Sequence, residues 1–369
     1  MTVGHSNQVF LNKRILIFVG PGGVGKTTLA ASVAVLAAIR GQKALVCTID
    51  PAKRLANALG IAELGNAEVE IPKSSFTDAG IEPKGRLWAM MLDMKRSWDE
   101  LIHRYASPAS QEKIFANRFY QSLSTSLAGS QEYIALEKLW EISNQRDYSL
   151  IALDTPPTTQ AIDFLDAPNR ILDFLGNDAT RWLLTPALLA GKIGLQLFNF
   201  GSNFVLKSIS KIAGIETLQG IATLLTEMRE MNEGFRQRAA EVGALLQDEQ
   251  TSFVLVTAAS SERVEETVRF YQQLRSSQMN VQTLVVNRVE EPPAAIRPED
   301  LEVLEPSLRE LCKATHREMQ LSAEQDQQII ERLTQACSPC SVLVVTRFED
   351  DVHDLSRLAL IASQLTGEG

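Results

Sequence analysis

The stretch GPGGVGKT at Gly20–Thr27 decides the fold class, because it fits the pattern G-x-x-x-x-G-K-[ST] of a phosphate-binding loop. It lies between an apolar run, Ile15–Gly20, and a helical segment, Lys26–Arg40, which is the strand–loop–helix context that this loop requires. Glycines let the backbone wrap closely around phosphate oxygens, and the N–H groups at the helix N-terminus then face the negative charge. The pattern therefore predicts a nucleotide-binding protein.

Six further apolar runs with β-branched residues each end in polar or turn residues, as buried strands do. Helical segments such as Ser261–Leu274 separate them, and strands that alternate with helices predict an α/β fold with a mostly parallel sheet flanked by helices. The predicted strands are Ile15–Gly20, Ala44–Asp50, Leu87–Leu92, Leu150–Asp154, Phe253–Thr257, Thr283–Asn287 and Val342–Thr346.

Two intervals, 95–144 and 161–250, are too long for simple crossovers between strands. They carry helical periodicity and many of the aromatic residues but no convincing strand. We therefore predict that they are two insertions that form one helical subdomain. The nucleotide-binding core is predicted to comprise residues 12–94, 145–160 and 251–369.

The composition excludes several classes of protein. Lys and Arg number 36 and Asp and Glu number 45, and a formal net charge of −9 argues against a general nucleic-acid binder. The longest uncharged stretches, Ile193–Leu206 and Leu333–Thr346, are shorter than the roughly 20 residues of a membrane-spanning helix. Met1–Asn12 lack the layout of a secretory signal, and four cysteines do not make a disulfide framework, so we expect a cytoplasmic protein.

Two aspartates at predicted strand ends complete a candidate site. Asp50 and Asp154 each close an apolar strand, and the carboxyl ends of strands in an open parallel sheet meet at the ligand crevice. Asp154 matches a Walker-B aspartate that supports Mg²⁺, while Asp50 could orient the attacking water or accept its proton. Lys26 can reach the β- and γ-phosphates of ATP, and the Thr27 hydroxyl can ligate Mg²⁺. The residues expected to cradle the nucleotide phosphates are Gly22, Gly23, Val24, Gly25, Lys26, Thr27 and Thr28.

The motifs GGVGKTT, IDPAKRL and DTPPT together resemble those of the arsenite-pump ATPase (ArsA) and tail-anchored-protein-targeting ATPase family. This family belongs to the deviant-Walker, SIMIBI-type P-loop NTPases, with MinD and the nitrogenase iron protein. Two more segments, Leu127–Tyr133 and Asp351–Leu355, resemble the prokaryotic branch of the family. The resemblance covers residues 12–365.

The resemblance implies specific roles for several residues. Asp50 matches the switch I aspartate that acts on water, and Asp154 matches the start of switch II, which couples the phosphate state to the helical subdomain. Asn287 resembles the strand-terminal asparagine that reads adenine. Family members with one phosphate loop work as homodimers, so we expect a homodimer that uses ATP/ADP and Mg²⁺.

One position departs from the family pattern G-K-G-G-V-G-K-T. Its first lysine reaches the nucleotide of the partner subunit, but here Pro21 offers neither a charge nor an N–H donor. Three outcomes are open: slow hydrolysis, substitution by a nearby cation such as Lys53 or Arg54, or a different dimer arrangement.

The pair Cys337 and Cys340 forms a C-x-x-C pattern. Targeting ATPases of the family share zinc across the dimer through such a pair, but one pair supplies only two of the four usual ligands. We favour ordinary small residues at a strand entrance over a zinc site. His353 beside two acidic residues favours a structural or nucleotide-adjacent role over a general base.

The apolar stretch Ala187–Leu206 does not decide what its side chains pack against. Such a stripe fits either a groove for a client's transmembrane helix or the subdomain's own core, since apolar periodicity marks burial and not the occupant. The leading interpretation is a Mg²⁺-dependent ATPase that acts as a dimeric switch and binds or delivers a hydrophobic client helix, with or without a membrane partner protein. The alternatives are the catalytic subunit of an arsenite or anion efflux pump and a low-turnover regulatory or scaffolding protein.

Overall fold

The computed structural model divides the chain into two compact units, and each is described by itself. The first comprises Met1–Met91, Arg146–Ile162 and Leu246–Gly369, and the second comprises Leu92–Gln145 and Asp163–Leu245. The residues that the structure describes are 10–49, 54–126, 130–155, 167, 220, 223–224, 226–228, 231–348 and 351–367. Of the helical subdomain predicted over 95–144 and 161–250, the second interval lies largely outside these residues, so the extent of the subdomain stays a prediction.

The first unit contains an eight-stranded sheet in the order β3-β4-β2-β5-β1-β6-β7-β8. Every neighbouring pair of strands is parallel except β3 and β4, which are antiparallel. The strands are β1 (Ile15–Val19), β2 (Lys43–Thr48), β3 (Val69–Glu70), β4 (Arg86–Met91), β5 (Leu150–Asp154), β6 (Thr251–Ala258), β7 (Val281–Val289) and β8 (Ser341–Thr346).

All seven predicted strands are present, and the mostly parallel α/β fold is confirmed. The central strands β1 and β5 are buried at every residue, as strands covered on both faces should be. The edge strand β3 was missed because two residues are too short to show the alternation of a strand.

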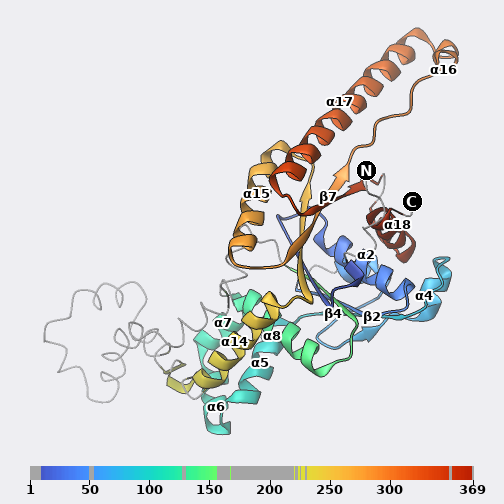
Figure 1. Cartoon of the computed structure of the whole chain (residues 1–369). Helices are drawn as coiled ribbons and strands as arrows, with labels where there is room; N and C mark the ends of the chain where they lie inside the picture. The colour runs from blue at the N-terminus through green and yellow to red at the C-terminus, as the bar shows by residue number, and fades with distance from the viewer. Residues whose placement is uncertain are drawn as a thin grey trace, which may run out of the picture. The chain divides into compact units, whose positions relative to one another are not determined.

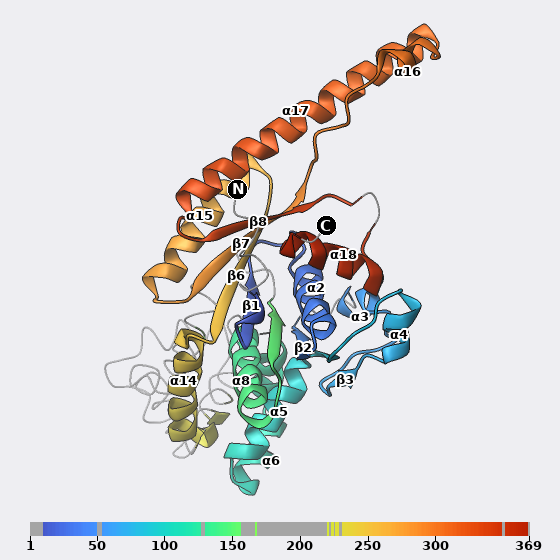
Figure 2. The same ribbon diagram turned by 45° about the vertical axis from the view of Figure 1, so that its right-hand side comes forward.

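Helices cover both faces of this sheet (Figures 1 and 2). On one face, α2 (Lys26–Ile39) packs against α18 (Leu355–Thr366) in the main hydrophobic core. On the other face, α15 (Ser261–Ser276) packs beside α17 (Pro306–Ala336). Because α2 is enclosed by the sheet and α18, its sequence is almost continuously apolar.

The length of the helix α17 was not predicted, although a helix was expected around Cys312. This helix follows the short helix α16 (Pro298–Glu302) and connects β7 to β8, and Figure 2 shows its N-terminal half extending beyond the sheet. Its buried residues, Ala323, Asp326, Ile329 and Leu333, all lie in the C-terminal half. Half of the helix therefore lacks the burial on which apolar periodicity depends. Two short helices, α3 (Arg54–Ala58) and α4 (Lys73–Asp78), complete the described helices of this unit.

The second unit is helical and has its own core. The aromatic residues Trp98, Tyr120 and Tyr133 are almost fully buried there, together with Met228 and Met231. These two methionines therefore pack the core of the unit. Its described helices are α5 (Met94–Tyr105), α6 (Pro108–Ala116), α7 (Arg118–Ser126), α8 (Ser130–Gln145) and α14 (Asn232–Gln247).

The stretch Ala187–Leu206 lies outside the described residues, so the choice between a client groove and a core stays open. Among the helices that the structure describes, none has both the length and the apolar composition that a membrane span requires.

Candidate functional site

The phosphate loop joins β1 to α2 and leaves the N-terminus of α2 without a side-chain cap. Gly25 occupies the N-cap position in the left-handed conformation, with φ 94° and ψ 23°, and no side chain accepts a hydrogen bond from the first turn. This first turn also contains no acidic residue. The backbone N–H groups and the positive end of the helix dipole are therefore suited to an anionic ligand.

Lys26 places a cation over this loop. Its ammonium Nζ donates to the carbonyl oxygens of Gly20 and Pro21, each at 2.9 Å, and the residue is only 6% exposed. The side chain thus folds back along the loop from the first residue of α2, where it can approach a bound phosphate. Thr27 and Thr28 follow on the same turn and are half-buried, while Gly22 and Gly23 are exposed and Val24 is buried.

Three elements meet at the carboxylate of Asp154. Its Oδ2 atom accepts hydrogen bonds from the hydroxyls of Thr27 at 2.6 Å and Thr48 at 2.8 Å. Asp154 ends β5 and is 1% exposed, because β5 lies between β1 and β2 in the sheet. Hydroxyl and carboxylate oxygens are the ligands that Mg²⁺ prefers. The donor set therefore fits a magnesium ion beside the phosphate loop.

Asn287 lies behind the loop. Its Nδ2 atom donates to the carbonyl of Val24 at 2.7 Å, and its Oδ1 atom accepts from the backbone N–H of Arg288 at 3.0 Å. The residue ends a buried stretch of β7 and is 8% exposed. Both ends of the amide thus bind backbone groups in this structure, and a contact with adenine stays a prediction.

The structure brings together Lys26, Thr27 and Asp154 but does not place every expected residue. Asp50 and Lys53 lie outside the described residues. Arg54 is exposed at the start of α3.

Sequence reasoning missed two residues that contact the site. Thr48 donates a hydrogen bond to Asp154. Its position two residues before Asp50, at the end of the same predicted strand, could have indicated that it lies near the site. Arg263, on the first turn of α15, donates from Nη1 to the carbonyl of Gly22 at 3.4 Å. No motif marks Arg263, because the contact depends on β6 lying beside β1 in the sheet.

The C-x-x-C pair lies at the entrance of β8. Cys337 is the C-cap residue of α17, and the N–H of Cys340 donates to its carbonyl at 2.8 Å. Both residues are buried, and burial raises the pKa of Cys337 to about 11 and that of Cys340 to about 12. Within the part of the chain that the structure describes, no group of three or more His, Cys, Asp or Glu residues could hold a metal ion.

The closing segment Asp351–Leu355 contributes a helix cap. The carboxylate of Asp354 accepts from the N–H of Arg357 at 2.8 Å and so caps α18. His353 is exposed, and its Nε2 atom lies 3.9 Å from the carboxylate of Asp351.

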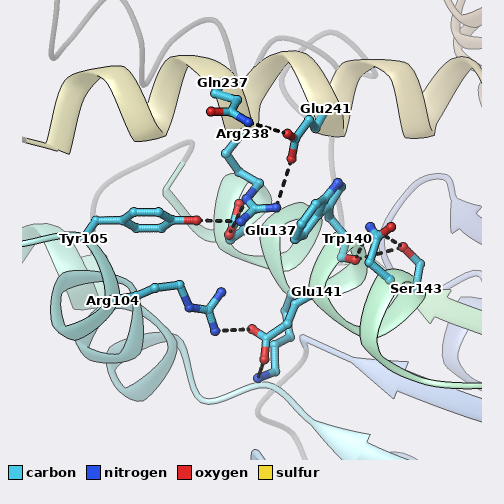
Figure 3. Close-up of polar contacts among 11 residues, drawn as sticks. Arg104, Tyr105, Glu137, Trp140, Glu141, Ser143, Gln237, Arg238 and Glu241 are labelled. Atoms are coloured by element: carbon cyan, nitrogen blue, oxygen red, sulfur yellow. Dashed lines mark hydrogen bonds and ion pairs between the residues drawn. The ribbon is translucent and has the colours of Figure 1, made fainter.

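The second unit holds a buried ion pair (Figure 3). The Nε atom of Arg238 on α14 lies 3.1 Å from a carboxylate oxygen of Glu137 on α8, and both side chains are almost fully buried. The guanidinium of Arg238 also stacks on Trp140 and donates to Glu241 and to the hydroxyl of Tyr105.

This environment changes the acidity of Glu137. Burial raises its pKa to about 7, although the positive charges of Arg238 and Arg104 oppose the shift. Glu141 and Glu241 add to the rise. Glu137 is therefore a candidate for titration near neutral pH.

Comparison with known proteins agrees with this geometry. The family model described as "Anion-transporting ATPase" matches residues 13–366, which is nearly the whole chain. The chain belongs to the ArsA ATPase family.

Three relatives show how similar the chain is to named ATPases. The chain is 27% identical to the ATPase GET3 of Malassezia globosa over 277 residues, which cover 74% of this chain and 72% of that protein. It is 28% identical to the ATPase GET3 of Rhodotorula glutinis, covering 74% of this chain and 69% of that protein. It is 27% identical to the ATPase ARSA1 of Chlamydomonas reinhardtii, covering 75% of this chain and 35% of that protein. The chain is an ATPase of the ArsA family, and the expected fold and enzyme class are confirmed.

Proposed function

We propose that this ATPase is a Mg²⁺-dependent, homodimeric switch that binds or delivers a hydrophobic client helix. Lys26 neutralises phosphate charge, Thr27 ligates Mg²⁺, and Asp154 supports the metal shell. Asp50 orients or activates the attacking water. A Mg²⁺ ion held by Thr27 and Asp154 would neutralise the charge that develops on the transferred phosphate.

The observation that carries the proposal is the shared carboxylate of Asp154. It joins the phosphate loop, through Thr27, to the end of β2, through Thr48. The chain after Asp154 continues into the second insertion of the helical unit, which begins at Asp163. A change in metal or phosphate state at Thr27 therefore acts on a strand end that connects covalently to the helices. Switches of this kind are released when the γ-phosphate is lost.

The hydrolytic assignment is tested by turnover of the purified full-length chain. We expect Lys26→Ala and Asp50→Asn each to lower kcat at least about 100-fold, because each removes a group that acts on the transferred phosphate or the water. Lys84→Ala removes an exposed lysine and is the matched control. Unchanged turnover in both site variants would show that the assigned chemistry is wrong.

The client is tested with a labelled peptide of about 20 apolar residues, the length of a membrane-spanning helix. We expect capture to depend on whether ADP or a non-hydrolysable ATP analogue is present. A second peptide of equal length with two central arginines is the control and should not bind. If neither nucleotide state captures the apolar peptide, the client assignment fails.

A catalytic subunit of an anion efflux pump is the second candidate, and the description of the family model favours it. It predicts that arsenite or antimonite stimulates ATP turnover, whereas the client proposal predicts no stimulation. Pro21 favours the third candidate, a low-turnover regulatory or scaffolding protein, because it removes the cross-subunit lysine of the family. That candidate predicts tight nucleotide binding with turnover as slow as in Lys26→Ala.

The homodimer is tested by light scattering on the eluting protein. We expect a mass near twice 40.7 kDa in the presence of the ATP analogue. A single-chain mass with every nucleotide would contradict a dimeric switch.

A further inference from the structure

Arg263 reaches the phosphate loop from the helix that follows the neighbouring strand β6. It lies on the first turn of α15, directly after β6, and β6 pairs with β1 in parallel register. The carboxyl ends of these two strands are therefore adjacent, and the guanidinium reaches the carbonyl oxygen of Gly22 at 3.4 Å. The side chain is half-buried.

Three successive carbonyls of the loop each accept from a cationic side chain. Lys26 binds the carbonyls of Gly20 and Pro21, and Arg263 binds that of Gly22. In the proposed function, Lys26 turns to the phosphates when ATP binds. Arg263 is then the side chain that still binds the loop backbone.

The peptide group between Gly22 and Gly23 needs such a contact. A Cβ built on Gly23 would meet no heavy atom within 4 Å, so side-chain packing does not fix this peptide. Its two ends are the carbonyl of Gly22 and the N–H of Gly23. In a loop that wraps an anion, N–H groups point inward and carbonyls can point outward. A charged donor on the carbonyl holds that orientation and polarises the N–H, which strengthens its bond to a phosphate.

We propose that Arg263 is a positioning residue for nucleotide binding: it holds the Gly22–Gly23 peptide with its N–H turned toward the phosphates. It also brings a second cation, from a distant segment of the same chain, to Gly22, the residue after Pro21. The inference rests on the proposed role of the loop in holding ATP. It assigns Arg263 to nucleotide affinity and not to the chemical step.

The test compares Arg263→Ala and Arg263→Lys with Arg269→Ala, an exposed arginine farther along α15. Steady-state turnover gives KM and kcat for MgATP, and calorimetric titration gives the Kd for ADP. For Arg263→Ala we expect KM and Kd to rise about tenfold, the effect of one charge-assisted hydrogen bond, while kcat changes less than about twofold. Arg263→Lys keeps one donor and should recover part of the loss, and Arg269→Ala should match the unchanged protein.

Thermal unfolding without nucleotide should be the same for Arg263→Ala and Arg269→Ala, since the contact acts on the loop and not on the core. Unchanged KM and Kd in Arg263→Ala, or a fall in kcat with KM unchanged, would overturn the inference. Lys26→Ala distinguishes this failure from failure of the proposed function. If Lys26→Ala binds nucleotide weakly while Arg263→Ala binds normally, only the role of Arg263 is wrong. If Lys26→Ala also binds normally, the proposed use of the loop is wrong as well.

Discussion

Replacing Gly25 by alanine tests how closely the phosphate loop packs on the end of β7. A Cβ built on Gly25 would lie 2.3 Å from the Nδ2 atom of Asn287, which is closer than real side chains approach. Asn287 cannot move away freely, because its backbone pairs with β6 on one side and β8 on the other. Its amide must therefore rotate and lose its 2.7 Å hydrogen bond to the carbonyl of Val24. We expect Gly25→Ala to destabilise the loop and the strand end together.

Gly23→Ala provides the matched control for the size of this effect. Gly23 has φ 76° and Gly25 has φ 94°, so alanine at either position pays about 1–2 kcal/mol for the left-handed conformation. A Cβ on Gly23 meets no heavy atom within 4 Å. The buried hydrogen bond lost at Gly25 adds about 1–3 kcal/mol. The free energy of unfolding should therefore fall by about 2–5 kcal/mol in Gly25→Ala and by about 1–2 kcal/mol in Gly23→Ala.

Urea unfolding of the nucleotide-free protein, followed by circular dichroism, measures this difference. A double-mutant cycle with Asn287→Ala identifies its cause. In the Asn287→Ala background the clash is absent, so the cost of Gly25→Ala should fall to that of Gly23→Ala. The reasoning is refuted if Gly25→Ala and Gly23→Ala lower the free energy of unfolding equally in the unchanged protein. It is also refuted if the difference between them stays as large in the Asn287→Ala background.

Three further predictions concern titratable groups. Asp154→Asn should lower kcat about 10- to 100-fold, because it weakens the coordination of the metal ion. Nucleotide binding measured in EDTA, where no metal is bound, should be unchanged. If the variant also binds nucleotide more weakly in EDTA, Asp154 does not act through the metal ion. The pKa of Glu137 is raised from 4.5 to about 7, so the folded protein holds the proton on this carboxyl more tightly than the unfolded chain does. The contribution of Glu137 to the free energy of unfolding therefore falls as the pH rises from about 4.5 to 7 and is constant above pH 7. The difference in unfolding free energy between Glu137→Gln and the unchanged protein should therefore change by about 2.5 kcal/mol between pH 5 and 8, and a flat difference would show that burial does not shift this group. Cys337 and Cys340, buried with raised pKa values, should react with a thiol reagent at pH 8 much more slowly than the half-buried Cys312, as mass spectrometry of the native protein would show; equal rates would contradict their burial.

The fold could be predicted where local pattern and burial agree. The apolar runs that became β1 and β5 are buried at every residue, so composition alone marks them as central parallel strands. The pattern is weaker where burial is partial. In β8 only Val345 is fully buried, although its apolar sequence still marks the strand. In α17 the N-terminal half is exposed, and its extent could not be predicted from an apolar stripe.

The candidate site shows a different limit. The motif predicted Lys26 and Thr27 because the loop's chemistry lies in eight consecutive residues. Thr48 and Arg263 reach the same site from distant segments. Their contacts follow from the strand order, in which β2 lies beside β5 and β6 lies beside β1. A single sequence carries no local signal for that order, so such residues emerge only when the sheet is assembled.

The strand order also explains how one carboxylate can bond to two segments at once. Asp154 ends β5, and β5 has β1 on one side and β2 on the other. The loop after β1 contributes Thr27, and the end of β2 contributes Thr48, both to the same Oδ2 atom. In the proposed function, a metal ion that drew Thr27 away from Asp154 would leave the bond from Thr48 in place. The segment after β2, which contains Asp50, and the segment after β5, which leads to the helical insertion, would then respond together. Under that proposal, Asp154 is one route by which the metal site acts on the chain that leads to the helical insertion.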